Sequence, residues 1–236
     1  MARAWFAALA AFVLLAPACA AERGERRADR GPTGPETRAV EPRVVEPGAV
    51  VEAEPSGPEP SDGRPARAVV SIPALDLRGL TVVPYRGRTD DARGTLIQNG
   101  GDAASPHGPR GGTGPGGIGN YQVTGHRLSS TMPFRHLPGL QRGDEVRVNV
   151  GETRYVYSIV GTRWTSFRSP RSLAEQRAAV PGRPGVEPRR AMITLSTCAT
   201  IEDHAAGNFW ADEFDNPEHR IDKIGVLERV TALDRG

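Results

Sequence analysis

From residue 67 onward the chain is built of short β-rich runs that end at glycine or proline. The stretch 146–150 alternates valine with polar residues, and Gly151 separates it from the β-rich stretch 154–160, which predicts a hairpin. Four further runs have the same character, namely 67–72, 80–83, 192–197 and 221–230. Short strands with frequent turns indicate an all-β fold, either a barrel or a sandwich.

Helix signals in the same region are short. Ser172 to Glu175 has the pattern of a capping box, which predicts a short helix that ends before Pro181. The stretch 100–119 is rich in glycine and proline and is predicted to be a long surface loop. Helices are therefore expected to be minor elements of the fold.

The first 21 residues form a targeting segment, with Arg3 before an apolar run that extends to Ala21. An uncleaved membrane anchor is one interpretation, because about 20 apolar residues span a bilayer. A signal peptide cleaved after Ala20 is a second, because Ala18 and Ala20 fit the small-x-small rule. In the third, the run before Cys19 is a degenerate lipoprotein box and Cys19 is lipidated. All three place the rest of the chain outside the cytoplasm.

Residues 22–66 have the composition of a linker. They are rich in proline, glutamate, glycine and serine and contain no aromatic residue. Such a segment cannot bury enough apolar surface to offset its ordering entropy, and its prolines favour an extended chain. We therefore predict three parts: a targeting segment at 1–21, a disordered linker at 22–66 and one folded domain at 67–236.

Charge and cysteine content narrow the functional classes. The formal net charge is +2, which gives no indication of nucleic acid as a partner. Cys19 and Cys198 are the only cysteines, and the position of Cys19 in the apolar run makes a structural disulfide between them implausible. A single cysteine in an exported domain is a candidate reactive thiol, although a small buried side chain is the alternative.

Three short strings carry residues suited to acyl transfer. Thr-Gly-His ends at His126, Thr-Leu-Ser-Thr-Cys ends at Cys198, and Arg220 opens the last predicted strand. A thiolate is a strong nucleophile, and a cationic neighbour is expected to lower the pKa of the thiol. A histidine can protonate the leaving amine, and a guanidinium can stabilise the negative oxygen of a tetrahedral intermediate. This chemistry needs no cofactor, and the sequence shows no cluster of metal ligands.

These strings resemble the sortase family of cell-surface transpeptidases. Residues 194–198 match the family's Thr-Leu-x-Thr-Cys signature, and Gly125 with His126 follows Asn120 as in its Gly-His motif. Further similar segments are Ser71 to Asp76, Pro133 to Leu137 and Gly143 to Val146. The resemblance covers about residues 67–230. The His-Arg pair after Gly125 is most similar to the class E branch of actinobacteria.

The resemblance implies an eight-stranded β-barrel of the sortase type and a catalytic set of His126, Cys198 and Arg220. It also implies an oxyanion hole shared by Arg220 and the backbone N–H of Ala199. The implied substrates are surface proteins with a C-terminal sorting motif, LPXTG-like or Leu-Ala-x-Thr-Gly, cut between Thr and Gly. The implied acceptors are amines of a peptidoglycan precursor or a pilin, and the implied location is the outer side of the cell membrane.

Residues 201–214, between Cys198 and Arg220, form an acidic and aromatic insertion. It is interpreted either as a loop that packs its own side chains on the barrel or as a lid or substrate wall beside the site. Two other functions compete with transpeptidation. A non-catalytic barrel that binds surface peptides would not need the thiol. A papain-like hydrolase is disfavoured because here the cysteine follows the histidine in the chain.

Overall fold

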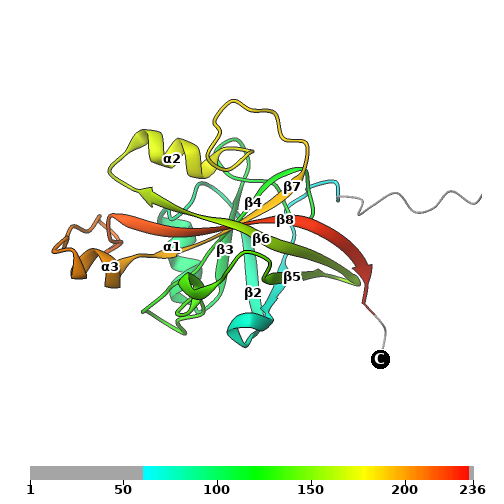
Figure 1. The fold of residues 1–236 in the computed structure, drawn as a ribbon, viewed down its shortest axis with the longest axis horizontal. Helices are drawn as coiled ribbons and strands as arrows, with labels where there is room; N and C mark the ends of the chain where they lie inside the picture. The colour runs from blue at the N-terminus through cyan, green and yellow to red at the C-terminus, as the bar shows by residue number, and fades with distance from the viewer. Residues whose placement is uncertain (1–60, 234–236) are drawn as a thin grey trace, which may run out of the picture. The chain divides into compact units, whose positions relative to one another are not determined.

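The structure is a computed structural model that describes residues 61–233, shown in Figure 1. Its eight strands close into one barrel in the order β1-β2-β3-β4-β7-β8-β6-β5. The strands are β1 Ala68–Ile72, β2 Leu77–Arg86, β3 Ala103–His107, β4 Gly119–Thr124, β5 Glu145–Val150, β6 Thr153–Ser166, β7 Ala191–Cys198 and β8 His219–Ala232. The predicted eight-stranded barrel is confirmed.

Most neighbouring strands are antiparallel, but β2 with β3 and β4 with β7 are parallel. Successive side chains of a strand point to opposite faces, so one set of alternate residues fills the barrel. This core is a continuous apolar cluster that includes Val82, Val123, Val148, Ile193 and Leu195. Closure of the barrel also leaves no open sheet edge.

Three α-helices lie outside the strands: α1 Ala92–Asn99, α2 Pro170–Arg177 and α3 Thr200–Ala205. Two 3-10 turns, η1 Pro73–Leu75 and η2 Leu137–Gly139, complete the elements of the described residues. The α2 helix ends before Pro181 as predicted, but its N-cap is Ser169 rather than Ser172. The Ser169 hydroxyl accepts the Ser172 N–H at 3.2 Å, and Pro170 takes the first helical position, which suits its fixed φ.

The stretch 100–119 is not a loop throughout, because β3 lies within it. Its sequence, Ala-Ala-Ser-Pro-His, contains no β-branched or aromatic residue and therefore lacks a strand signal. The strand forms because β2 pairs with it in parallel over five residues, from Val82 opposite Ala103 to Arg86 opposite His107. Tertiary pairing here overrides local propensity.

Residues 61–66 fall inside the predicted linker but contact the domain. The Ser61 N–H donates to the Gly116 carbonyl at 2.9 Å, and the Gly114 N–H donates to the Gly63 carbonyl at 2.8 Å. The ordered region therefore begins at least six residues before position 67. The predictions for residues 1–21 and for 22–60 lie outside the described residues. Within 61–233, no helix combines the length and apolar character of a membrane span.

Candidate active site

Strand register brings the three predicted site residues together. Cys198, the last residue of β7, pairs directly with Arg220 on β8. On the other side of β7, the parallel strand β4 pairs Thr124 with Ser196, so His126 comes level with Cys198 two residues further on. The Gly125 N–H donates to the Ser196 carbonyl at 3.2 Å, which continues this pairing beyond β4. Paired residues point to the same face, so all three side chains gather on one side of the sheet.

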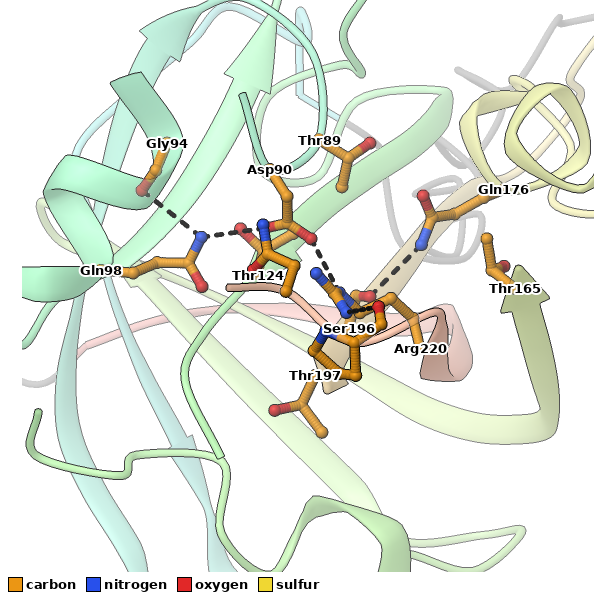
Figure 2. A network of polar contacts seen from close by, with 12 residues as sticks. Thr89, Asp90, Gly94, Gln98, Thr124, Thr165, Gln176, Ser196, Thr197 and Arg220 are labelled. Carbon is orange, nitrogen blue, oxygen red and sulfur yellow. Dashed lines mark hydrogen bonds and ion pairs between the residues drawn. The ribbon is translucent and has the colours of Figure 1, made fainter. Parts of the chain in front are cut away.

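That face lies on the outside of the barrel and is lined by buried polar side chains. The next residues on this face, two positions away from the site residues along each strand, are Thr124, Ser196 and Asp222. All three are nearly inaccessible to water. Figure 2 shows Gln176 of α2, Gln98 of α1 and Asp90 of the loop before α1 near Ser196 and Thr124 of this layer. The Gln176 amide of α2 donates to Asp222 at 3.0 Å and to Ser196 at 3.3 Å. The side chains that pack next to the site are therefore buried, hydrogen-bonded polar groups on the outer face, not the apolar core of the barrel.

Cys198 is a partly exposed free thiol. Burial of the sulfur raises its pKa above the ordinary value, and Arg220 opposes this shift, whereas Asp90 and Asp212 add to it. Arg220 therefore lowers the pKa of this thiol as expected, but desolvation outweighs the guanidinium and the net shift is upward. The thiol is neutral at pH 7, so a base must remove its proton.

His126 meets that requirement. Burial lowers the pKa of its imidazole below 6.5, Asp90 opposes this shift and Arg220 adds to it, so the ring is neutral at pH 7. Its Nε2 lies 2.7 Å from Oδ1 of Asn99, the last residue of α1. An amide oxygen only accepts, so Nε2 donates and the lone pair of the neutral ring is on Nδ1. The β4–β7 register thus aligns the neutral imidazole of His126 with the neutral thiol of Cys198.

Arg220 is almost completely buried, at 1% exposure, and most of its donors are occupied. Nε donates to Asp90 Oδ2 at 3.0 Å, and Nη1 donates to the carbonyls of Pro217 and His219. Phe167 packs against the guanidinium at 4.1 Å. Nη2 is buried and has no hydrogen-bond partner among residues 61–233. An unpaired buried donor is costly, so this N–H group is suited to donate to the oxygen of a bound substrate.

The predicted second oxyanion donor is not supported. The Ala199 N–H donates to the His219 carbonyl at 2.9 Å, which extends the β7–β8 ladder by one residue. This N–H is therefore already paired and cannot also hold an oxyanion in this arrangement. Of the two groups predicted for the oxyanion hole, only Arg220 has a free donor.

Sequence reasoning missed several residues that hold the site in place. Arg127 is buried, forms a two-pronged ion pair with Glu202 of α3, and donates to the Cys198 carbonyl at 3.2 Å. Asp90 contacts Arg220, and Asn99 contacts His126. Asp90 and Asn99 come from α1 and the turn before it, a segment that has no apolar periodicity, so the sequence does not predict a helix at these residues. The aspartate pair before α1 is a possible N-cap and is the one signal that could have revealed it.

A cavity of about 410 Å³ opens beside the site. Phe167, which packs on Arg220, forms part of its wall, as does Asp90. The 201–214 insertion supplies another part of the lining through Trp210, Asp212, Glu213 and Phe214. None of His126, Cys198 and Arg220 lines this cavity, so the interpretation of the insertion as a substrate wall stays a prediction. Among residues 61–233, no group of His, Cys, Asp and Glu could hold a metal ion.

Comparisons with known proteins agree with this geometry. The sortase domain family matches residues 70–210, which is more than half of the chain. SrtA sortase from Actinomyces oris is similar in fold, with a TM-score of 0.54 at 19% identity over 77% of this chain and 89% of that one. Sortase E from Streptomyces avermitilis gives a TM-score of 0.51 at 25% identity over 73% and 93%. Sortase E1 from Streptomyces coelicolor, solved with a tripeptide in its active site, gives 0.52 at 21% over the same shares. No curated protein matches the chain.

Proposed function

The chain belongs to the sortase family of cysteine transpeptidases, and on that premise we propose that Cys198, His126 and Arg220 carry out its reaction. The proposed substrate is a surface protein with a C-terminal LPXTG-like sorting motif, cut between Thr and Gly. The proposed acceptor is an amine of a cell-wall precursor or a pilin. The observation that carries the proposal is the register of β4, β7 and β8, which aligns a thiol, a neutral imidazole and a free guanidinium N–H on one face.

In the first half of the reaction, His126 takes the proton of the Cys198 thiol through Nδ1. The sulfur attacks the carbonyl carbon of the motif threonine, and the carbonyl oxygen becomes negative. Arg220 Nη2 donates to this oxygen, which stabilises charge that exists only in the transition state and intermediate. The imidazolium then protonates the glycine nitrogen, the C–N bond breaks, and a thioester remains on Cys198.

In the second half, the acceptor amine attacks the thioester carbonyl. His126 takes the proton that the amine loses, and the C–S bond breaks when the new amide forms. The imidazolium returns that proton to the sulfur, so the enzyme regains its starting state. Water in place of the amine would give hydrolysis by the same steps, which is the endopeptidase activity expected when no acceptor is present.

We further propose that the enzyme acts outside the cytoplasm and is attached to the cell membrane by its N-terminal segment. The apolar run at 4–21 supports an anchor, a cleaved signal or a lipidated Cys19. Each of these exports the domain, and the anchor and the lipid also attach it to the membrane. The polar, proline-rich stretch that follows would hold the domain away from the lipid surface. A substrate displayed on the outer side of the membrane would then be within reach.

The resemblance to class E supports a preference for Leu-Ala-x-Thr-Gly over the proline form. Proline lacks a backbone N–H and fixes φ, so a groove that uses this N–H would favour alanine. Discrimination that depends on an unpaired polar group can be large, whereas a difference in size alone contributes about 1–3 kcal/mol. Sortase E1 from Streptomyces coelicolor was solved with a tripeptide in its active site, which supports peptide binding at this position of the fold.

The proposal is tested by a competition assay with two matched peptides that differ only in Ala or Pro at the second motif position. The enzyme, both peptides and an amine acceptor are incubated together, and the products are separated and weighed by mass spectrometry. We expect cleavage between Thr and Gly, amide products with the acceptor, and a higher kcat/KM for the alanine peptide. Equal values would remove the class E preference alone. Peptide binding without any cleavage would instead favour a non-catalytic barrel.

A further inference from the structure

The segment between β2 and the end of α1 contacts two of the three proposed catalytic side chains. Asp90 lies just before the helix, and Gln98 and Asn99 are its last two residues. Asp90 forms an ion pair with Arg220, with Nε to Oδ2 at 3.0 Å, and Asn99 lies 2.7 Å from His126 Nε2. One short stretch of chain therefore reaches both the oxyanion donor and the acid–base group.

The Asp90 carboxylate is held at both oxygens. Oδ2 accepts from Arg220, and Oδ1 accepts from the Gln98 amide at 2.9 Å, as Figure 2 shows. Both side chains of the Asp90–Arg220 pair are almost fully buried, at 6% and 1% exposure. Breaking a buried pair of this kind leaves an uncompensated charge, so the two groups constrain each other.

The backbone also fixes Asp90 in one orientation. Its φ is 53°, in the left-handed region that aspartate tolerates better than most residues. The next residue, Asp91, caps α1 by accepting the N–H groups of Arg93 and Gly94. Gly94 lies against the Tyr85 hydroxyl so closely that a Cβ there would overlap it. The first turn of α1 is thus packed closely against Tyr85 of β2. Asp90, just before this turn, has little freedom to turn away from Arg220.

The consequence for Arg220 follows from its donor count. A guanidinium has five N–H groups in a fixed plane. Asp90 takes the Nε group and backbone carbonyls take Nη1, which leaves Nη2 as the edge available to substrate. Without Asp90 the plane could rotate and present another edge, and a misplacement of about 1 Å can reduce the rate by about 10²-fold.

We propose that Asp90, supported by Gln98, is a positioning residue that orients Arg220 so that Nη2 faces the oxyanion, and that Asn99 orients His126 from the same helix end. This inference rests on the function proposed above for Arg220 and His126. It assigns α1 and the turn before it to the reaction, although none of their side chains touches the reacting atoms. The opposite possibility is that Asp90 restrains Arg220 and lowers its activity.

The test compares Asp90→Asn, Gln98→Met and Asn99→Ala with a matched control, Asp76→Asn. Asp76 is also an aspartate with positive φ, at 51°, and it pairs with an arginine, Arg78, at 2.9 Å. That pair is exposed and remote from the proposed reacting groups. For each full-length protein, kcat and KM are measured with a sorting peptide, and the alkylation rate of Cys198 by iodoacetamide is measured by peptide mapping. Thermal unfolding confirms that each variant folds.

We expect Asp90→Asn to lower kcat about 10- to 100-fold with KM changed less than about threefold. The Cys198 alkylation rate should stay the same or rise, because the Asp90 charge is one of the groups that raises the pKa of this thiol. Asn99→Ala should also lower kcat, and Gln98→Met should lower it less. Gln98→Met keeps the Asp90–Arg220 pair, so it remains informative if Asp90→Asn fails to fold. Asp76→Asn should leave all rates unchanged.

Three results would overturn the inference. A normal kcat in Asp90→Asn or, where that variant does not fold, in Gln98→Met would show that Arg220 needs no support. A higher kcat would show that Asp90 restrains the arginine. Loss of kcat together with a slower alkylation rate would indicate general damage to the site. Failure of the proposed function is recognised separately, because the wild type would then turn over no sorting peptide at all, whereas its alkylation rate would still be measurable.

Discussion

His126 and His219 both lie within two residues of a strand end at the site, yet only His126 is on the side of the thiol. His219 precedes Arg220 on β8, so its side chain points to the opposite face of the sheet. There its Nδ1 lies 2.7 Å from Asp203 Oδ1, and its own N–H donates to Asp203 Oδ2 at 3.0 Å. These contacts give His219 a structural role in joining α3 to β8.

We therefore expect His126→Ala to lower kcat about 10²- to 10⁴-fold, the contribution of a general acid–base group. His219→Ala should keep most of the activity but lower the thermal unfolding temperature, because it leaves Asp203 with only one of its two partners. Steady-state kinetics and thermal unfolding of the two variants check this prediction. If only His219→Ala were inactive, the assignment of the acid–base group to His126 would be wrong.

At the scale of elements, the strand that carries the nucleophile and most others could be predicted from sequence, whereas the supports of the site could not. The predicted strands at 67–72, 146–150, 154–160, 192–197 and 221–230 all form. At 146–150 the alternation of apolar and polar residues reflects one buried face, whereas β7 and β8 are buried on both faces over most of their length. The helix α1 buries only Gly94 and Gln98, so it has no apolar stripe from which to predict it. Its place depends on capping and on contacts with distant strands.

The 201–214 insertion offers an element-scale prediction with an internal control. Trp210 lines the cavity beside Arg220, whereas Phe209 does not and is 72% exposed. If the insertion is a substrate wall, Trp210→Ala should raise KM for the sorting peptide several-fold with little change in kcat, because binding contacts are lost equally in ground and transition states. Phe209→Ala should change neither constant. Equal effects of the two substitutions would favour a loop without contact to substrate.

At the scale of the whole molecule, a buried polar layer joins α2, β6, β7 and β8 around Asp222. The Thr165 hydroxyl donates to Asp222 at 2.6 Å, and the Gln176 amide donates to its other oxygen. Burial nevertheless raises the pKa of this carboxyl above its ordinary value of 3.8. Such a layer is invisible in a sequence read strand by strand, because polar residues on the outer face of a barrel are expected to meet water.

This layer predicts a pH dependence of stability. Between pH 3.8 and the raised pKa, the folded protein holds a proton on Asp222 that the unfolded chain has lost, so stability falls as pH rises through this range. Above the raised pKa of Asp222, the stability contributed by its protonation is fully lost. Asp222→Asn removes this ionisation while its Oδ1 can still accept from Gln176, and its NH2 group, in the place of Oδ2, can donate to the Thr165 hydroxyl. Relative to wild type, the variant should gain stability from pH 4 to pH 7 in denaturant titrations. A relative loss over this range would contradict the account.

The central claim is that Cys198 carries the acyl group of a sorting peptide. The most direct measurement is intact-protein and peptide-mapping mass spectrometry of the full chain after brief incubation with a sorting peptide and no amine acceptor. We predict a mass increase equal to the acyl fragment that ends at threonine, less the thiol hydrogen, located on Cys198 and absent from Cys198→Ala. Cleaved peptide without any adduct on Cys198, or an adduct confined to Cys19, would contradict the claim.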